Sequence, residues 1–159
     1  MRKRLAWLVI LSLMVGSVTT GSVSAGDQIV TLTANLTGAQ EFPGPGDPDG
    51  SAKATVMINV AAGQVCFDIK SFKDTGAPNR GHIHTGAAGT AGGIVIPFFE
   101  LVGAQADPRN DQLESGRIQD CVSADPALLA NIVANPELYY VNVHNARFPA
   151  GSLRCQLET

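Results

Sequence analysis

The feature that most constrains the fold of this chain is the alternation of apolar and polar residues in many short segments. Residues 51–60 carry alanine, valine or isoleucine at every second position, and residues 63–72 do so through Val65, Phe67 and Ile69. Successive side chains of a β-strand point to opposite faces, so this pattern predicts strands with one buried face. The short connection between these two segments predicts a β-hairpin.

About eight segments alternate in this way or are rich in β-branched and aromatic residues. They are residues 28–36, 51–60, 63–72, 81–84, 93–99, 115–122, 138–145 and 151–158. Glycine, proline and aspartate separate them at short intervals, which is typical of a β-sandwich or a β-barrel. We therefore expect an all-β fold.

One segment has helical spacing instead. Asp125 can cap a helix and Pro126 suits its first position. Apolar residues then recur three and four positions apart until Asn135-Pro136, which ends the pattern. We expect one short helix near 126–134, packed across one end of the sheets.

The first 25 residues have the pattern of a signal peptide. A basic start, Arg2-Lys3-Arg4, precedes an apolar run that is too short to span a bilayer comfortably, and Val23-Ser24-Ala25 fits the small-x-small cleavage rule. The alternative is an uncleaved membrane anchor. We predict a signal peptide at 1–25, one domain at 26–159, no membrane span in the mature form, and a secreted or periplasmic location.

The charge of the mature chain excludes one class of partner. The whole chain has 11 basic and 14 acidic residues, and the predicted signal peptide holds three of the basic ones and no acidic one. Its removal changes the net charge from −3 to −6. An acidic chain without a basic patch argues against nucleic acid or an anionic membrane as a partner.

The chain has three cysteines, Cys66, Cys121 and Cys155. Export to an oxidising compartment would favour one disulfide. Three pairings can be drawn, and the residues alone do not choose among them.

The three histidines of the chain lie in two predicted strands. His82 and His84 are two positions apart and therefore project to the same side, while His144 shares a face with Tyr140 and Asn142. If the two strands are neighbours, three imidazoles converge. Neutral imidazoles bind copper, zinc or iron, and three protein ligands with an open position are typical of a catalytic metal. The alternative is a structural role in hydrogen bonding.

Other motifs give weaker indications. Asp47 and Asp49 lie in the Pro/Gly-rich segment 41–50 without the further ligands of a calcium loop, so a turn is the better interpretation. Glycine-rich residues 84–93 lack the features of a phosphate loop. Arg147 and Arg154 could bind an anion near His144, although solvated charges are the commoner explanation. No serine has a nucleophile-elbow setting and no pair of carboxylates can be assigned to glycoside hydrolysis, so no catalytic residue is predicted.

Several of these stretches together resemble the CHRD domain family, named after chordin. They are "LTGAQEFPGPGDPDGSAKATVMI", "GQVCFDI", "GHIHTGAAGTAGGIVIPF" and "DCVSADPALLANIVANPELYYVNVHNARFPAGSLRCQL", the last with Asn142 and Arg154 among its characteristic residues. The resemblance is to the bacterial secreted members and spans most of the mature chain. It implies an immunoglobulin-like Greek-key β-sandwich and favours a Cys66–Cys121 disulfide.

The same family has a distant similarity to copper/zinc superoxide dismutases. His82-Ile83-His84 resembles the copper-binding strand of those enzymes, and "AGSLRC" resembles their C-terminal stretch, an analogy that would tie Cys155 to a loop cysteine instead. A dismutase needs four copper histidines and further zinc ligands. The chain has three histidines in total, so the complete two-metal site is absent.

Two functions from different classes follow. The first is a non-enzymatic extracellular module that binds a protein or a matrix component. The second is a redox protein that binds copper or zinc through His82, His84 and His144, with Asn142 and Arg154 as neighbouring site residues. A hydrolase has no supporting residues.

Overall fold

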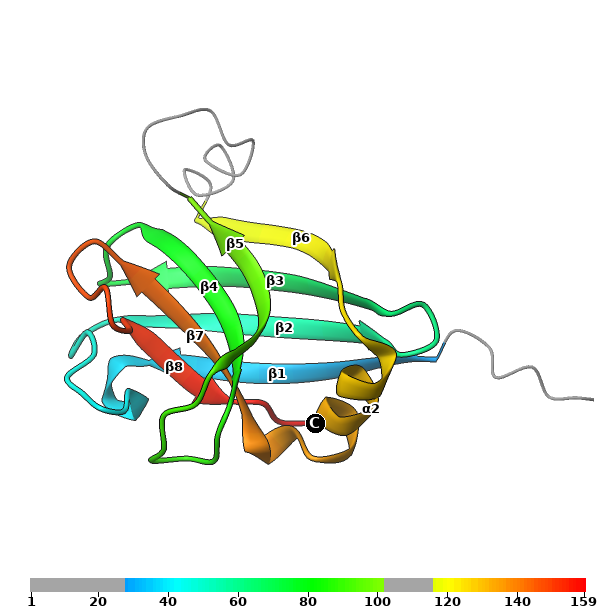
Figure 1. Cartoon of the computed structure of the whole chain (residues 1–159). Helices are drawn as coiled ribbons and strands as arrows, with labels where there is room; N and C mark the ends of the chain where they lie inside the picture. The colour runs from blue at the N-terminus through cyan, green and yellow to red at the C-terminus, as the bar shows by residue number, and fades with distance from the viewer. Residues whose placement is uncertain (1–27, 102–115) are drawn as a thin grey trace, which may run out of the picture.

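The structure is a computed structural model that describes residues 28–101 and 116–159 (Figure 1). The predicted signal peptide lies outside the described residues. Within the described residues, eight antiparallel strands and one α-helix form the domain, which confirms the predicted fold class. The strands are β1 (Ile29–Thr37), β2 (Ser51–Asn59), β3 (Gln64–Lys73), β4 (Pro78–Thr85), β5 (Ile94–Glu100), β6 (Arg117–Ser123), β7 (Tyr139–Asn145) and β8 (Leu153–Gln156).

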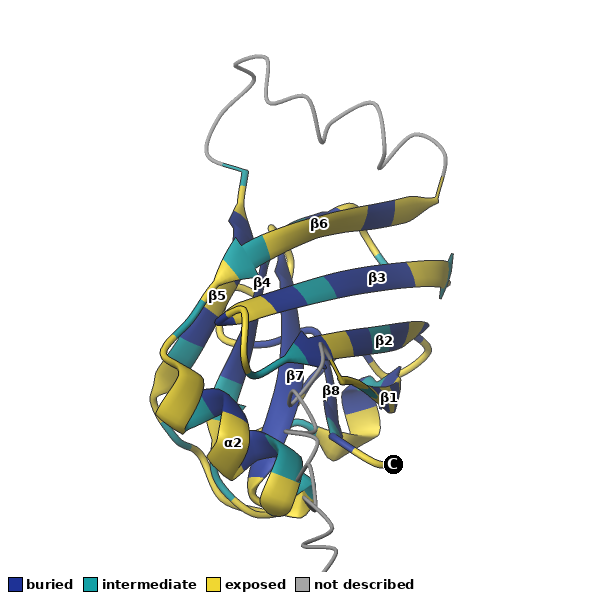
Figure 2. Cartoon of the chain, turned by 90° about the vertical axis from the view of Figure 1, so that its right-hand side faces the viewer, coloured by how far each residue is buried: buried dark blue, intermediate teal, exposed yellow. Residues whose placement is uncertain are grey.

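The strands form one sheet in the order β5-β4-β7-β8-β1-β2-β3-β6. The sheet folds over so that β5-β4-β7-β8 faces β1-β2-β3-β6, and the buried residues line the space between the two halves (Figures 1 and 2). At one side the halves are joined by pairing of Thr37 in β1 with Arg154 in β8. At the other side β5 approaches β6, so the sheet is nearly closed.

The core consists of the apolar residues that the alternation predicts. Leu32 and Leu36 of β1, Val56 and Ile58 of β2, and Ile69 of β3 are all fully buried. β2 and β3 form the expected hairpin in antiparallel register. The core is therefore the consequence of period-two spacing on strands that share one inner side.

The helix α2 (Pro126–Ala134) has the predicted bounds. The Asp125 carboxylate accepts a hydrogen bond from the Ala127 amide at 2.8 Å, and Pro126 occupies the first turn. Leu129 and Ile132 are buried against one end of the sheet (Figure 1). Two short 3-10 turns, η1 (Gly38–Gln40) and η2 (Pro136–Leu138), complete the regular structure of the described residues.

Most strand bounds differ from the prediction by one or two residues. The largest difference is at β4, which begins at Pro78 rather than at residue 81; a strand can start with proline, since the first residue needs no ladder hydrogen bond from its nitrogen. β8 covers only Leu153–Gln156 instead of 151–158. Beyond it, Glu158 forms an isolated bridge with Thr33 of β1.

The disulfide joins Cys66 of β3 to Cys121 of β6, as the family resemblance implies. The two residues are direct partners in the register of these strands. Cys155 is free and buried, so the alternative pairing through Cys155 is wrong. In the described part of the chain, no helix is long and apolar enough to cross a membrane.

Candidate metal centre

The histidines lie on the outer face of β4, β7 and β8, the face that points away from the core. Cross-strand register places the polar side chains of this face in rungs. The rungs are Arg80 with His144, His82 with Asn142 and Arg154, and His84 with Tyr140 and Gln156. The two predicted histidine strands are therefore neighbours.

This outer face is covered although it lies outside the core. Every residue of β7 is buried, including Tyr140, Asn142 and His144. Backbone and side-chain groups from three loops contact the face: Glu41 binds Asn142, the Gly92 amide donates to the Tyr140 hydroxyl, and the Pro149 carbonyl binds His144. The loops thus turn a nominally solvent-facing surface into an enclosed polar site.

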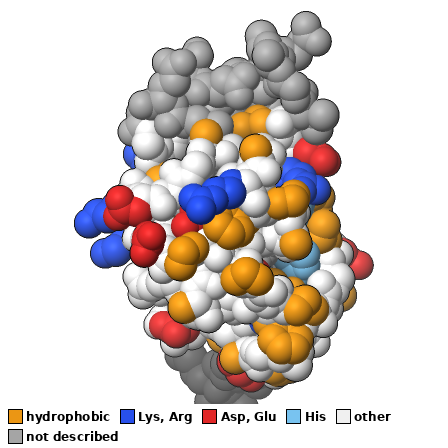
Figure 3. Space-filling model, turned by 90° about the vertical axis from the view of Figure 1, so that its left-hand side faces the viewer, with side chains coloured by type: hydrophobic (Ala, Val, Ile, Leu, Met, Phe, Trp, Pro, Cys, Tyr) orange, Lys and Arg blue, Asp and Glu red, His pale blue; other side chains and the backbone are white. Residues whose placement is uncertain are grey.

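The structure brings His82, His84 and His144 together. One ring nitrogen from each lies within 4.8 Å of those of the other two. The ring centroids are 5.2 Å apart for His82 and His144, 5.5 Å for His82 and His84, and 6.3 Å for His84 and His144. His82 and His144 are buried and His84 is half-buried. Figure 3 shows a histidine side chain in a hollow bordered by hydrophobic side chains.

Backbone carbonyls orient two of the rings. His84 Nδ1 donates to the Gly92 carbonyl at 3.0 Å, and His144 Nδ1 donates to the Pro149 carbonyl at 3.1 Å. The proton must lie on Nδ1 in each case, because a carbonyl can only accept. His84 Nε2, His144 Nε2 and His82 Nδ1 are buried and have no hydrogen-bond partner among the described residues. Each ring therefore offers an unused nitrogen, and two of them have a fixed tautomer.

The surroundings keep the imidazoles neutral. Burial, together with the nearby His144, His84 and Arg80, lowers the pKa of His82 to about 4. Burial lowers the pKa of His144 to about 4, against the opposing effect of its bond to Pro149. The pKa of His84 is lowered mainly by burial. Neutral imidazole is the form that binds a metal.

Arg154 holds the loop between β4 and β5 in place by hydrogen bonds. Its side chain is 1% exposed, and its guanidinium carbon lies 3.4 Å from the centre of the Tyr140 ring. It donates to the carbonyls of Thr90 and Ala87 and to the side chain of Gln156. His84 stacks on the same tyrosine ring at 5.0 Å. Arg154 is thus a buried structural cation, and the interpretation of it as a solvated charge is wrong.

A comparison with known families decides what kind of domain carries this site. The family model of the CHRD domain matches residues 32–157. The chain belongs to the CHRD domain family. No curated protein and no solved structure gives a significant match. The matched part of the CHRD domain includes all three histidines and the arginine that fastens the loop.

The sequence analysis of this CHRD domain missed Glu41. Its Oε1 accepts a hydrogen bond from Asn142 Nδ2 at 2.6 Å. Burial raises the pKa of Glu41 to about 7, although Asn142 and Arg154 act in the opposite direction. Gly151 makes room for the carboxylate, since a Cβ there would lie 2.5 Å from Glu41 Oε2. Glu41 lies in a Pro/Gly-rich stretch that indicated only a turn.

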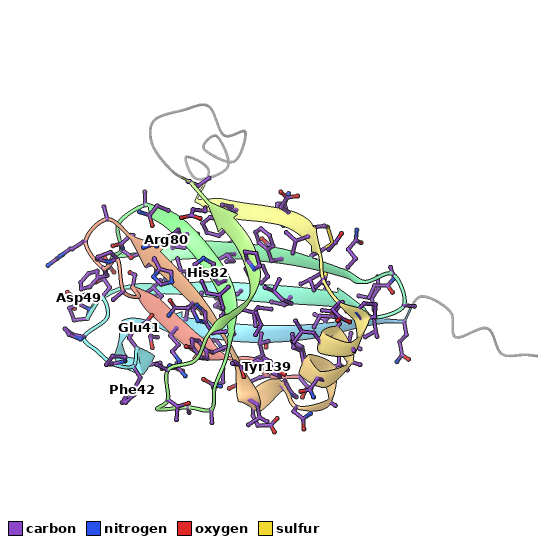
Figure 4. All side chains as sticks on the ribbon, in the orientation of Figure 1. Glu41, Phe42, Asp49, Arg80, His82 and Tyr139 are labelled. Atoms are coloured by element: carbon purple, nitrogen blue, oxygen red, sulfur yellow. A yellow bond between two sulfur atoms is a disulfide. The ribbon has the colours of Figure 1, made fainter. Side chains whose placement is uncertain are left out.

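Arg80 was missed as well. Its Nη2 donates to the Pro149 carbonyl at 2.8 Å, the same oxygen that binds His144. Figure 4 shows Arg80 and His82 on the same strand, with Glu41 on the neighbouring loop. Arg80, His82 and His84 lie at every second residue, a spacing that would have placed Arg80 on the same face as the histidines. The strand was predicted to begin at residue 81, so Arg80 was left out of it.

Arg147 is exposed and lies over the ring of Phe148 at 5.3 Å, so it does not join the buried cluster. Asp47 is buried, and its carbonyl accepts from the Gly50 amide in a turn, as expected for the segment 41–50. A surface groove of about 600 Å³ lies elsewhere, over the disulfide on the other half of the sheet.

Proposed function

We propose that this CHRD domain binds a copper or zinc ion through His82, His84 and His144. Two observations carry the proposal: one ring nitrogen of each histidine lies within 4.8 Å of those of the other two, and each ring has a buried nitrogen that no described residue binds. Metal–nitrogen bonds of about 2.0–2.1 Å in tetrahedral geometry bring ligand nitrogens to roughly 3.4 Å. Small adjustments of the side chains would reach that distance. A buried polar atom without a partner is costly, and a metal ion would remove that cost at all three nitrogens.

The ligand set determines which ions fit. Three imidazoles without a carboxylate or thiolate suit copper and zinc better than calcium or magnesium, which need oxygen ligands. Metal-binding histidines usually donate their other ring N–H to a carbonyl or carboxylate, and the carbonyls of Gly92 and Pro149 accept such bonds from His84 and His144. Three protein ligands leave a coordination position open, where a bound ion could act as a Lewis acid or, in the case of copper, exchange electrons.

We further propose that the domain works outside the cytoplasm. The Cys66–Cys121 disulfide indicates an oxidising compartment, in agreement with the predicted signal peptide. Binding to an extracellular protein or a matrix component stays a prediction of the family resemblance.

The test is a titration of the purified protein, freed of any histidine tag, with Cu²⁺ and with Zn²⁺ after treatment with a chelator. We expect one ion per chain. The variants His82→Ala, His84→Ala and His144→Ala should each lower the affinity by more than about 100-fold, because each removes one of three direct ligands. Calorimetry measures the affinity, and elemental analysis measures the stoichiometry.

A second measurement separates binding at the site from adventitious binding. The chain has three histidines in total, so every imidazole signal in an NMR spectrum belongs to the cluster. Zinc should shift all three sets of signals, while Thr31→Ala, an exposed change on β1, should leave the titration unchanged. Absence of stoichiometric metal, or wild-type affinity in all three histidine variants, would refute the proposal.

A further inference from the structure

Within residues 28–101 and 116–159, Arg80 is the one cation that borders the histidine cluster and keeps most of its donors unused. It is half-buried, and its guanidinium makes one hydrogen bond, to the Pro149 carbonyl at 2.8 Å. The same oxygen accepts from His144 Nδ1 at 3.1 Å, so the guanidinium and the imidazole are held beside each other. Among the described residues Arg80 has no ion pair.

Arg154 cannot take the same part. Its Nη1 and Nη2 donate to two loop carbonyls and to Gln156, and the Tyr140 ring covers its planar face. Arg154 therefore holds the structure together, whereas the free N–H groups of Arg80 are available to a ligand.

The charges around the cluster are unbalanced. A divalent ion on three neutral imidazoles would keep its full charge, and Arg80 and Arg154 add two more positive charges nearby. Two acids lie beside this face: Glu41, whose carboxylate accepts a hydrogen bond from Asn142, and exposed Glu100, the cross-strand partner of Arg80, which forms no ion pair with it in the described structure. These two carboxylates balance at most half of the four positive charges. An uncompensated charge in a half-buried site is unfavourable, so such a site attracts an anion from solution.

We propose that the metal-loaded site binds a small anion at the open coordination position and that the Arg80 guanidinium holds this anion by a charge-assisted hydrogen bond. The inference rests on the proposed metal site and adds the class of ligand that the site takes. Arginine suits this part because its fixed fork of N–H groups can donate to Pro149 and to an anion at the same time.

The test uses azide as the anion and the Cu²⁺-loaded protein, in which bound azide gives a charge-transfer absorption. Azide is titrated into the wild type, Arg80→Met and Arg147→Met. Arg80→Met should weaken azide binding by about tenfold, because it removes a hydrogen bond to a charged group. Arg147→Met is the matched control: it removes an equal charge close to His144 in the chain, but from an exposed side chain, and should change the azide affinity less than about twofold.

The copper affinity is measured first, in each variant. It should be unchanged or higher in Arg80→Met, since a neighbouring positive charge is removed. If Arg80→Met does not hold copper, Arg80→Gln replaces it, because the glutamine amide can still donate to Pro149. A variant that holds copper, lacks the guanidinium and binds azide as tightly as the wild type overturns the inference and leaves the metal site intact. A wild-type protein that binds no copper overturns both.

Discussion

The two outer faces of the sheet have the same alternating pattern and very different surroundings. On β4, β7 and β8 the outward side chains are enclosed, and Asn142, His144 and Arg154 are 3%, 7% and 1% exposed. On β2, β3 and β6 the outward side chains meet solvent, and those of Lys70 and Arg117 are each 47% exposed. The difference comes from the loops that cover the first face and leave the second open.

The loops that cover a face exclude water, so the polar residues of that face need hydrogen-bond partners from the protein. On the open face, Arg117 and Lys70 both bind Asp68, and water can solvate whatever these bonds leave unsatisfied. On the covered face, each polar atom needs a partner from the protein. Three histidine nitrogens lack such a partner among the described residues, which is why the histidine cluster and not the groove over the disulfide is the candidate for a metal site.

We expect the largest effect on stability from removal of the disulfide, which lies on the open face formed by β2, β3 and β6. The double variant Cys66→Ser/Cys121→Ser frees a closed loop with a sequence separation of 55 residues. Loop entropy predicts a loss of about 4 kcal/mol in the free energy of unfolding. Urea denaturation measures this loss, and calorimetry of the folded variant with zinc should give wild-type affinity. A large fall in zinc affinity would show that the faces are coupled.

The next prediction compares two arginines. Arg154→Lys keeps the charge but cannot supply the fork that binds Thr90, Ala87 and Gln156 together. We expect a loss of about 3 kcal/mol in the free energy of unfolding, because buried acceptors lose their charged partner. Zinc affinity should also fall, since the loop that orients His84 loosens.

The matched control for this comparison is Arg117→Lys on the open face. Asp68 is buried, but it keeps the bond to Lys70, and a lysine at position 117 still offers it a charge from a half-exposed side chain, so the thermal unfolding midpoint should move little. Equal destabilisation by the two variants would contradict the view that coverage makes the difference.

The smallest effect concerns Glu41 and depends on pH. Its pKa is about 7 in the folded protein against 4.5 as the ordinary value. The stability that comes from the protonated carboxyl is therefore complete below pH 4.5 and is lost as the pH rises through 7, by roughly 1–2 kcal/mol because solvent screens the partly exposed carboxyl. Glu41→Gln has no such loss, and its stability relative to wild type should increase between pH 4.5 and 7.

The control for the Glu41 prediction lies in the comparison itself. His82 and His144 have lowered pKa values of about 4, so they reduce stability as the pH falls from 6.5 towards 4. The wild type and Glu41→Gln both contain these histidines, so their contribution cancels in the difference between the two free energies of unfolding. Urea denaturation at pH 4.5, 6 and 7.5 gives the difference, and a constant value across this range would contradict the burial of the carboxyl.

Most of the local structure could be predicted from the sequence because it follows from spacing. The helix 126–134 has its bounds since Asp125, Pro126 and Asn135 act on the backbone next to them. Alternation also gave the inner and outer faces of the strands, and the facing of His82 and His84 followed from it.

The spacing of residues along the chain could not predict which strands and loops contact one another in the fold. The convergence of His144 with the other pair depends on β7 pairing with β4, a contact between residues more than 50 positions apart in the chain. The burial of Arg154 and the approach of Glu41 depend on loops, whose paths no period describes. Arg80 was lost by a boundary error of three residues at the start of β4.

The orientation of the imidazoles has a consequence for how such a domain can vary. Gly92 and Pro149 hold the rings of His84 and His144 through main-chain oxygens, so the path of the backbone sets the orientation of the rings. Gly92 itself has to stay glycine, because a Cβ there would collide with the Thr85 carbonyl. Exchanging residues at the tips of these connections can leave the rings in place. Inserting or deleting a single residue there would turn them, and the spacing of the connections is therefore what an engineer of this scaffold has to preserve.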